Sequence, residues 1–166
     1  LAGAFVLLSF TYSHKSVRFK EIPVLDCLNS AAIYTVPGLI AYSLFAPLSS
    51  LPLAIFFVIL PYMGVQAMTT LVDEAVDRQA GMTTIGVVFK KRLTTVFVIV
   101  LFAIGAYALR QYTILLSIFL ISIFSAIIFL VSRGNDEKYF SFALSVVLLS
   151  FGMVAMLYFI LQANAV

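Results

Sequence analysis

Cysteine and histidine are almost absent, because each occurs once in 166 residues. The single cysteine, Cys27, excludes an internal disulfide and any cysteine-based metal cluster. The single histidine, His14, cannot form a metal site of the kind that several histidines build. We expect Cys27 to be a small buried or lipid-facing residue and His14 to be a surface residue.

Charged residues are also scarce, at 10% of the chain, whereas 63% of the residues are hydrophobic. A soluble domain carries about 25% charged residues. A water-soluble fold of this size could not bury so much apolar surface. The composition therefore predicts a membrane protein. The net charge of +3 is small, and we expect no nucleic-acid partner.

Six apolar runs are separated by polar or turn-forming segments and lack the period-2 alternation of membrane β-strands. Helices are the spanning element that fits such runs. The runs cover residues 1–12, 27–46, 53–72, 93–109, 113–132 and 139–161. The sequence therefore predicts an all-α, polytopic transmembrane helix bundle in one domain, 1–166, with about five complete spans and a partial N-terminal one. Pro37 and Pro61 should kink their helices.

The first run is shorter than the roughly 20 residues that a spanning helix needs. The chain begins with Leu1 rather than Met, and its first residues show no signal-peptide pattern. We therefore expect the sequence to be a fragment that begins within a helix.

Basic residues favour alternate connectors between the runs. Nine of the ten lie in three of them: Lys15, Arg18 and Lys20; Arg78, Lys90, Lys91 and Arg92; Arg133 and Lys138. Only Arg110 lies in an opposite connector. The positive-inside rule places the three basic connectors in the cytoplasm. The pattern predicts an integral, multi-pass protein of the inner cell membrane.

Three of the seven acidic residues fall within five positions, in the segment D-E-A-V-D-R that begins at Asp73. On a helix, Asp73 and Asp77 share one face about 6 Å apart. Two carboxylates this close repel each other unless a cation lies between them. Mg²⁺ suits such a pair because it prefers oxygen ligands and substrate phosphates. The alternative is a solvated helix end, where Arg78 neutralises part of the charge.

The residues around this acidic segment favour a phosphate ligand. Gly81 can end the helix, and two threonine hydroxyls and a basic cluster follow it. In the first polar connector, Lys15, Arg18 and Lys20 could neutralise phosphate oxygens, and Arg can do so with two parallel hydrogen bonds. The alternative is a basic membrane anchor without a ligand.

Two patterns together resemble the UbiA-type intramembrane prenyltransferases. The first comprises Tyr12, Ser13, Arg18, Lys20, Pro23 and Asp26, and the second comprises Asp73, Asp77, Arg78, Gly81, Thr83, Thr84 and Gly86. Two predicted spans separate them, as in that family. The resemblance covers essentially the whole chain, from part of helix four to helix nine of a nine-helix fold. Within the family, residues 18–38 are most similar to lycopene elongases.

The resemblance implies a helix bundle around a lipid-open cavity, with an aspartate-rich site for Mg²⁺ and an isoprenyl diphosphate. The matching residues are Asp73 and Asp77 as catalytic metal ligands, Tyr12 as a catalytic residue near the reacting carbon, and Arg18, Lys20 and Arg78 at the diphosphate. Asp26 and Glu74 have no assigned role. The family's first aspartate motif is missing, so we do not expect this fragment alone to catalyse.

The implied reaction is Mg²⁺-dependent transfer of an isoprenyl group from an allylic diphosphate to a hydrophobic acceptor, through an allylic cation. A carotenoid end such as lycopene is one acceptor. Quinone, heme, chlorophyll and archaeal-lipid precursors remain alternatives. A cation-coupled transporter segment and a noncatalytic membrane scaffold are alternatives of other classes. The expected partners are the donor, the acceptor and membrane lipid, without an obligate protein partner.

Overall fold

A computed structural model of the protein describes residues 1–51, 53–131 and 141, and these residues form helices and turns without a strand. The α-helices are α1 (Ala2–Ser13), α2 (Leu25–Ser43), α3 (Ile59–Val72), α4 (Glu74–Gln79), α5 (Ile85–Ala108) and α6 (Thr113–Val131). Three short 3₁₀ helices, η1 (Phe19–Glu21), η2 (Leu48–Ser50) and η3 (Leu53–Val58), lie between them. The all-α prediction is confirmed over the described residues.

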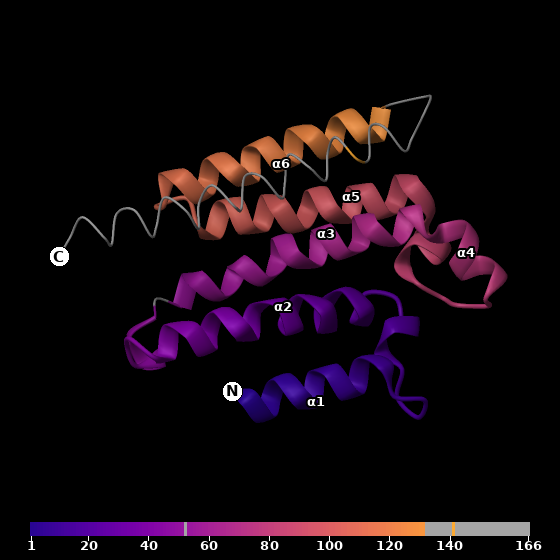
Figure 1. Ribbon diagram of the computed structural model, residues 1–166. Helices are drawn as coiled ribbons and strands as arrows, with labels where there is room; N and C mark the ends of the chain where they lie inside the picture. The colour runs from indigo at the N-terminus through magenta and orange to yellow at the C-terminus, as the bar shows by residue number, and fades with distance from the viewer. Residues whose placement is uncertain (52, 132–140, 142–166) are drawn as a thin grey trace.

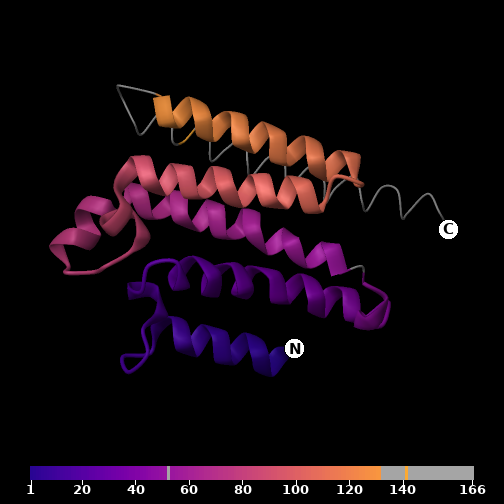
Figure 2. The ribbon, with the colours of Figure 1, turned by 180° about the vertical axis from the view of Figure 1, so that it is seen from behind.

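The five long helices lie side by side in chain order, and neighbours run in opposite directions (Figures 1 and 2). The connector from α1 to α2 and the segment that contains α4 therefore lie at the same end of the bundle (Figure 1). The turn that contains η2 and the turn from α5 to α6 lie at the other end. The predicted grouping of the first two basic connectors at one end is confirmed.

The predicted transmembrane bundle is wrong. In the part of the chain that the structure describes, no helix combines the length and the apolar character needed to cross a bilayer. Helices α2 and α6 have 19 residues each, α1 has 12 and α3 has 14, whereas a span needs roughly 20. Helix α5 has 24 residues, but it includes three basic residues and leaves helical geometry at Lys90.

In run 53–72 the α-helix is shorter than the apolar run that predicted it. Its first part forms η3, and the α-helix begins only at Ile59. Pro61 therefore lies in the first turn of α3, where the backbone N–H has no intrahelical acceptor and its loss costs little. The expected kink at Pro61 is replaced by a helix start. The predicted run 139–161, apart from residue 141, lies outside the described residues, as do Arg133 and Lys138 before it.

The core is formed where α3, α5 and α6 approach closely. Phe102 of α5 is buried, and its ring meets the ring of Phe119 of α6 edge to face, with centroids 6.3 Å apart. Each ring also lies over a glycine: Phe102 over Gly64 of α3 and Phe119 over Gly105 of α5. Small residues on one helix therefore accept large aromatic side chains from the next, which is the close packing that protein interiors require.

A second close approach fixes the beginning of α5 against the end of α3. The Gly86 backbone N–H donates a hydrogen bond to the Thr70 hydroxyl at 3.0 Å. A Cβ atom at Gly86 would lie 2.3 Å from the Thr70 carbonyl oxygen. Because that oxygen belongs to the backbone of a packed helix, it cannot move aside as a side chain could.

Gly86→Ala should therefore destabilise the protein by about 1–3 kcal/mol, the usual cost of overpacking. The measurement is the unfolding midpoint, followed by circular dichroism. The matched control is Gly38→Ala, because a Cβ at Gly38 meets no atom within 4 Å. That control should be neutral or slightly stabilising. Equal stability of the two variants would contradict the close approach.

Candidate functional site

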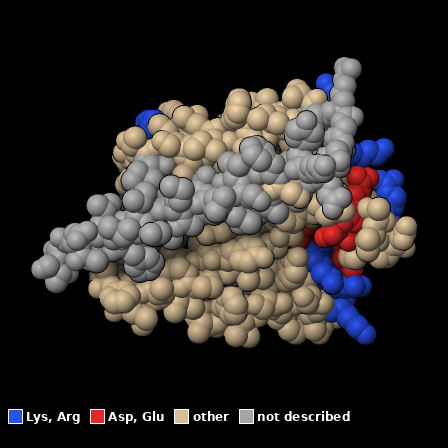
Figure 3. All heavy atoms as spheres, turned by 45° about the horizontal axis from the view of Figure 1, so that its top comes forward, with Lys and Arg blue, Asp and Glu red and all other residues tan. Residues whose placement is uncertain are grey.

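Charged side chains gather at the end of the bundle that holds the two polar connectors. In Figure 3 the acidic groups lie together at this end, with basic groups around them, while the rest of the visible surface is largely uncharged. The first connector supplies Arg18, Lys20 and Asp26, and the segment around α4 supplies the acidic cluster. The sequence patterns of both connectors therefore meet in one region.

Asp73 and Asp77 lie on either side of a bend rather than within one straight helix. Helix α3 ends at Val72, and Asp73 has φ −86° and ψ 0° before α4 begins. The Asp77 N–H still donates to the Asp73 carbonyl oxygen at 2.8 Å. However, Asp73 is exposed and Asp77 is buried. The two carboxylates thus lie one turn apart in the chain but differ in their access to water.

The turn after α4 returns the chain to Asp77. The Met82 N–H donates to the Asp77 carbonyl oxygen at 2.9 Å, and Gly81, with φ +72°, donates to the Arg78 carbonyl oxygen. This pair of bonds is the Schellman motif, which favours glycine at the left-handed position. The predicted helix end at Gly81 is confirmed. The buried Thr84 then donates its hydroxyl to Oδ2 of Asp77 at 2.9 Å.

Asp26, which sequence reasoning left without a role, is the most buried carboxylate of the described residues, with 1% exposure. It lies in the first turn of α2. Burial raises the pKa of Asp26 to about 6. Hydrogen bonds from the Tyr12 hydroxyl and the Gln66 amide oppose this rise in pKa, and the negative charge of Asp77 adds to it. Asp77 therefore lies close enough to act on the charge of Asp26, although the two residues are 51 positions apart in the chain.

Tyr12 is held in this region by polar contacts of α1 with α2. Its hydroxyl hydrogen-bonds to Ser30 and Asp26, and burial raises the pKa of Tyr12 above its usual value. The buried Asn29 of α2 adds two contacts with α1. Its side-chain amide donates to the Leu8 carbonyl oxygen at 3.0 Å, and its side-chain oxygen accepts from the Thr11 hydroxyl at 3.3 Å. These contacts bring the predicted catalytic tyrosine next to Asp26.

The two polar connectors also touch directly. The Thr83 hydroxyl donates to the backbone carbonyl of Glu21, which lies in η1. Arg18 precedes η1 in a left-handed conformation, with φ 42°. Its guanidinium pairs with the Glu21 carboxylate at 2.8 Å, and Lys20 is half-buried beside it. The contact therefore places the predicted diphosphate residues of the first connector beside the loop that follows α4.

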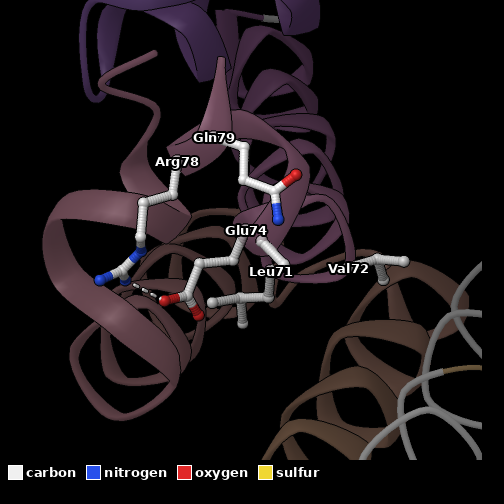
Figure 4. Close-up of a pocket in the computed structure, with 6 residues that line it drawn as sticks. Leu71, Val72, Glu74, Arg78 and Gln79 are labelled. Atoms are coloured by element: carbon white, nitrogen blue, oxygen red, sulfur yellow. Dashed lines mark hydrogen bonds and ion pairs between the residues drawn. The ribbon is translucent and has the colours of Figure 1, made fainter. Parts of the chain in front are cut away.

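Arg78 and Glu74 face a different side of α4 from Asp77. They form an ion pair, and both line an open hollow with Leu71, Val72, Ala75 and Gln79 (Figure 4). Asp77 does not line this hollow, since its carboxylate is directed to Thr84. The structure therefore separates Arg78 from the buried Asp26–Asp77 region, whereas the sequence pattern had grouped Arg78 with Asp77.

Carboxylates are the groups at this end that suit a divalent metal. Within the described ranges, no three His, Cys, Asp or Glu side chains lie close enough together to hold a metal ion by themselves. The donors present are hard carboxylate oxygens from Asp73 and Asp77, which Mg²⁺ prefers and completes with water or phosphate oxygens. This donor chemistry fits Mg²⁺ held jointly with a phosphate ligand.

Comparison with known proteins gives one partial similarity. Over 81 residues, or 49% of its length, the chain is 32% identical to a lycopene elongase/hydratase of Haloarcula japonica. The matched part is 27% of that relative's length, so the chain spans well under half of it. No protein-family model matches the chain, and no solved structure does. The chain is thus similar in part to an enzyme named for lycopene, while membership of the UbiA-type family stays a prediction.

The buried Asp26 should make stability depend on pH. Its folded pKa, about 6, lies above the unfolded value near 4, so the folded protein holds the proton more tightly. The associated stability is present below about pH 4 and is lost as pH rises to about 6, by roughly 3 kcal/mol in total. Asp26→Asn should remove this loss, which unfolding midpoints across that pH range measure.

The control for this measurement is Asp73→Asn, which removes an exposed carboxylate at the same end of the bundle. It should keep the pH slope of the unmodified protein. A slope that is the same in Asp26→Asn and Asp73→Asn would show that the burial of Asp26 does not set the pH dependence.

Proposed function

We propose that this chain is part of an enzyme that transfers an isoprenyl group from an allylic diphosphate to the end of a carotenoid. The partial similarity to a lycopene elongase/hydratase supports the carotenoid acceptor. The two motif patterns, which resemble those of UbiA-type prenyltransferases, support the transfer. The parts of the relative that this chain does not match would complete the enzyme.

The observation that carries the proposal is the convergence of the two polar connectors. Asp26 lies in the first turn of α2 and Asp77 lies in α4, yet the negative charge of Asp77 contributes to the raised pKa of Asp26. Thr83 hydrogen-bonds to the first connector, which presents Arg18 and Lys20. Carboxylates for a metal and cations for a diphosphate therefore meet at one end of an otherwise apolar bundle.

The proposed reaction balances without a redox partner. The C–O bond of the allylic diphosphate breaks, and its electron pair leaves on the diphosphate. A carbon–carbon double bond of the carotenoid end then supplies the electron pair for the new C–C bond. The resulting acceptor cation loses a proton to form an alkene, or it adds water and loses a proton to form an alcohol. Arg18 and Lys20 stabilise the negative charge that develops on the leaving diphosphate.

Asp73 and Asp77 would hold the Mg²⁺, together with oxygens of the bound diphosphate. When bound, the ion supplies positive charge that favours departure of the diphosphate. Thr84 orients Asp77 by donating to Oδ2. The bend at Asp73 leaves that carboxylate in water, where it can meet a diphosphate that arrives from outside the bundle.

Asp77→Asn and Asp73→Asn should each lower isoprenyl transfer by roughly 100-fold or more, a loss typical of removing a group that stabilises transition-state charge. The assay uses the full-length protein, a labelled isoprenyl diphosphate, lycopene and Mg²⁺, and it measures the labelled elongated product. The matched control is Glu137→Gln, which removes one negative charge outside the two motif patterns and should leave the rate unchanged.

Retention of transfer in both aspartate variants would remove the basis for a metal role. Loss of transfer in Glu137→Gln to the same extent would show that net charge, rather than the position of the carboxylate, matters. Absence of any labelled product from the unmodified full-length protein, with several isoprenyl chain lengths, would overturn the proposed function.

We also propose that the apolar outer surface contacts membrane lipid, from which a hydrocarbon acceptor would reach the protein. Large apolar side chains are exposed along the described helices and turns, and Phe45 is 89% exposed. Leu44 and Leu53 are similarly exposed near the end of the bundle that lacks the acidic cluster. Soluble monomers rarely show such extended apolar patches. Acyl chains would cover this surface while the charged end stays in water.

Phe45→Glu should weaken binding of the full-length protein to phosphatidylglycerol vesicles by about tenfold, because one large apolar side chain contributes about 1.5 kcal/mol or more when buried. Vesicle flotation measures the bound fraction. The control is Gln111→Glu, which adds the same charge at an exposed polar position of the α5–α6 turn. Equal flotation of the two variants would argue against lipid contact at Phe45.

A further inference from the structure

Helix α1 packs only partly against its neighbour, so packing alone gives Tyr12 limited support. None of the α1 residues, all of which the structure describes, is buried. Helix α1 lies at the edge of the bundle, next to α2 (Figures 1 and 2). An edge helix without a buried face holds its side chains in place mainly through specific polar contacts. For the Tyr12 hydroxyl, these contacts are Ser30 and Asp26 of α2.

Asp26 is in turn held by a residue of a third helix. The side-chain amide of Gln66, on α3, donates to Oδ1 of Asp26 at 3.5 Å. Gln66 comes from an apolar run, and neither polar connector contains it. A hydrogen bond to a buried carboxylate both offsets its desolvation and fixes its orientation.

Gln66 lies on α3, a helix that contributes to the buried core. Its neighbours Ala67 and Met68 are buried in the core, and Gly64 packs beneath the Phe102 ring. The amide therefore extends from a helix of the core toward Asp26 of α2, and Tyr12 of the edge helix α1 lies next to Asp26. A chain of hydrogen bonds runs from the core helix α3 through α2 to α1.

We propose that Gln66 is a positioning residue that orients the Asp26 carboxylate, and through it the hydroxyl of Tyr12, at the diphosphate end of the bundle. The inference rests on the proposed isoprenyl transfer, in which Tyr12 lies near the reacting carbon. Gln66 itself touches neither substrate. It acts by keeping Asp26 in the orientation that accepts from Tyr12.

The test is a double-mutant cycle in the full-length protein, with Gln66→Met, Tyr12→Phe and the double variant. Met keeps the length of the side chain and removes its amide. Gln66→Met should lower kcat about tenfold and change the KM for the isoprenyl diphosphate less than twofold. In the Tyr12→Phe background, Gln66→Met should have almost no further effect, because the hydroxyl that it positions is gone.

Gln111→Met makes the same replacement at an exposed glutamine and serves as the control, with kcat and KM unchanged. Losses that multiply in the double variant would overturn the proposal, since Gln66 would then act independently of Tyr12. An unchanged kcat in Gln66→Met, or a rise in KM alone, would overturn it as well.

A second double-mutant cycle measures the unfolding midpoint of the same variants. It keeps the proposal testable if a variant loses activity because it folds poorly. The unfolding midpoint of the double variant should shift by less than the sum of the shifts in Gln66→Met and Tyr12→Phe, because both substitutions break the same chain of hydrogen bonds. Additive shifts would overturn the chain of contacts itself. If the unmodified protein transfers no isoprenyl group, the proposed function fails, and with it the positioning role of Gln66 in that reaction, whatever the midpoint cycle shows.

Discussion

Two carboxylates kept away from water, Asp26 and Asp77, constrain the polar end of this protein. Withdrawing a carboxylate from water costs free energy unless hydrogen bonds replace the lost hydration. Asp26 receives such bonds from Tyr12 and Gln66, and Asp77 receives one from Thr84. The donors come from α1, α3 and the residue that directly precedes α5. Satisfying these two side chains therefore fixes how several helix ends meet.

Close helix packing and the polar end depend on each other. The Gly86 N–H bonds to the Thr70 hydroxyl, which sets the first turn of α5 directly against α3. Thr84 lies two residues earlier, so the same contact determines that its hydroxyl reaches Asp77. Between Asp77 and Thr84, the left-handed backbone conformation of Gly81 reverses the direction of the chain. A shift of α5 along α3 would thus alter the orientation of Asp77 without changing any charged residue.

The molecule has a charged end and a largely apolar outer surface, and isoprenyl transfer to a hydrocarbon would need both. One end carries carboxylates, hydroxyls and basic groups suited to a metal-bound diphosphate (Figure 3). The remaining described surface exposes large apolar side chains suited to a lipid-soluble acceptor. Tyr12 lies at the border, since it extends from an apolar helix into the polar end.

The sequence by itself predicted the apolar part of each long helix, the shared end of the first two basic connectors and the end of α4 at Gly81, because apolar runs, clustered charges and glycine are visible in the sequence. It missed the beginning of α5, since residues 85–92 lie in a stretch that reads as a polar connector. It overestimated the spans, since run 53–72 divides into a 3₁₀ and an α-helix and α5 includes basic residues. Only the tertiary structure decided that Asp73 is exposed while Asp77 is buried, and that Gln66 reaches Asp26. The physical reason is that burial and hydrogen bonding depend on contacts between distant segments, and a lone amide in an apolar run carries no pattern that would reveal its partner.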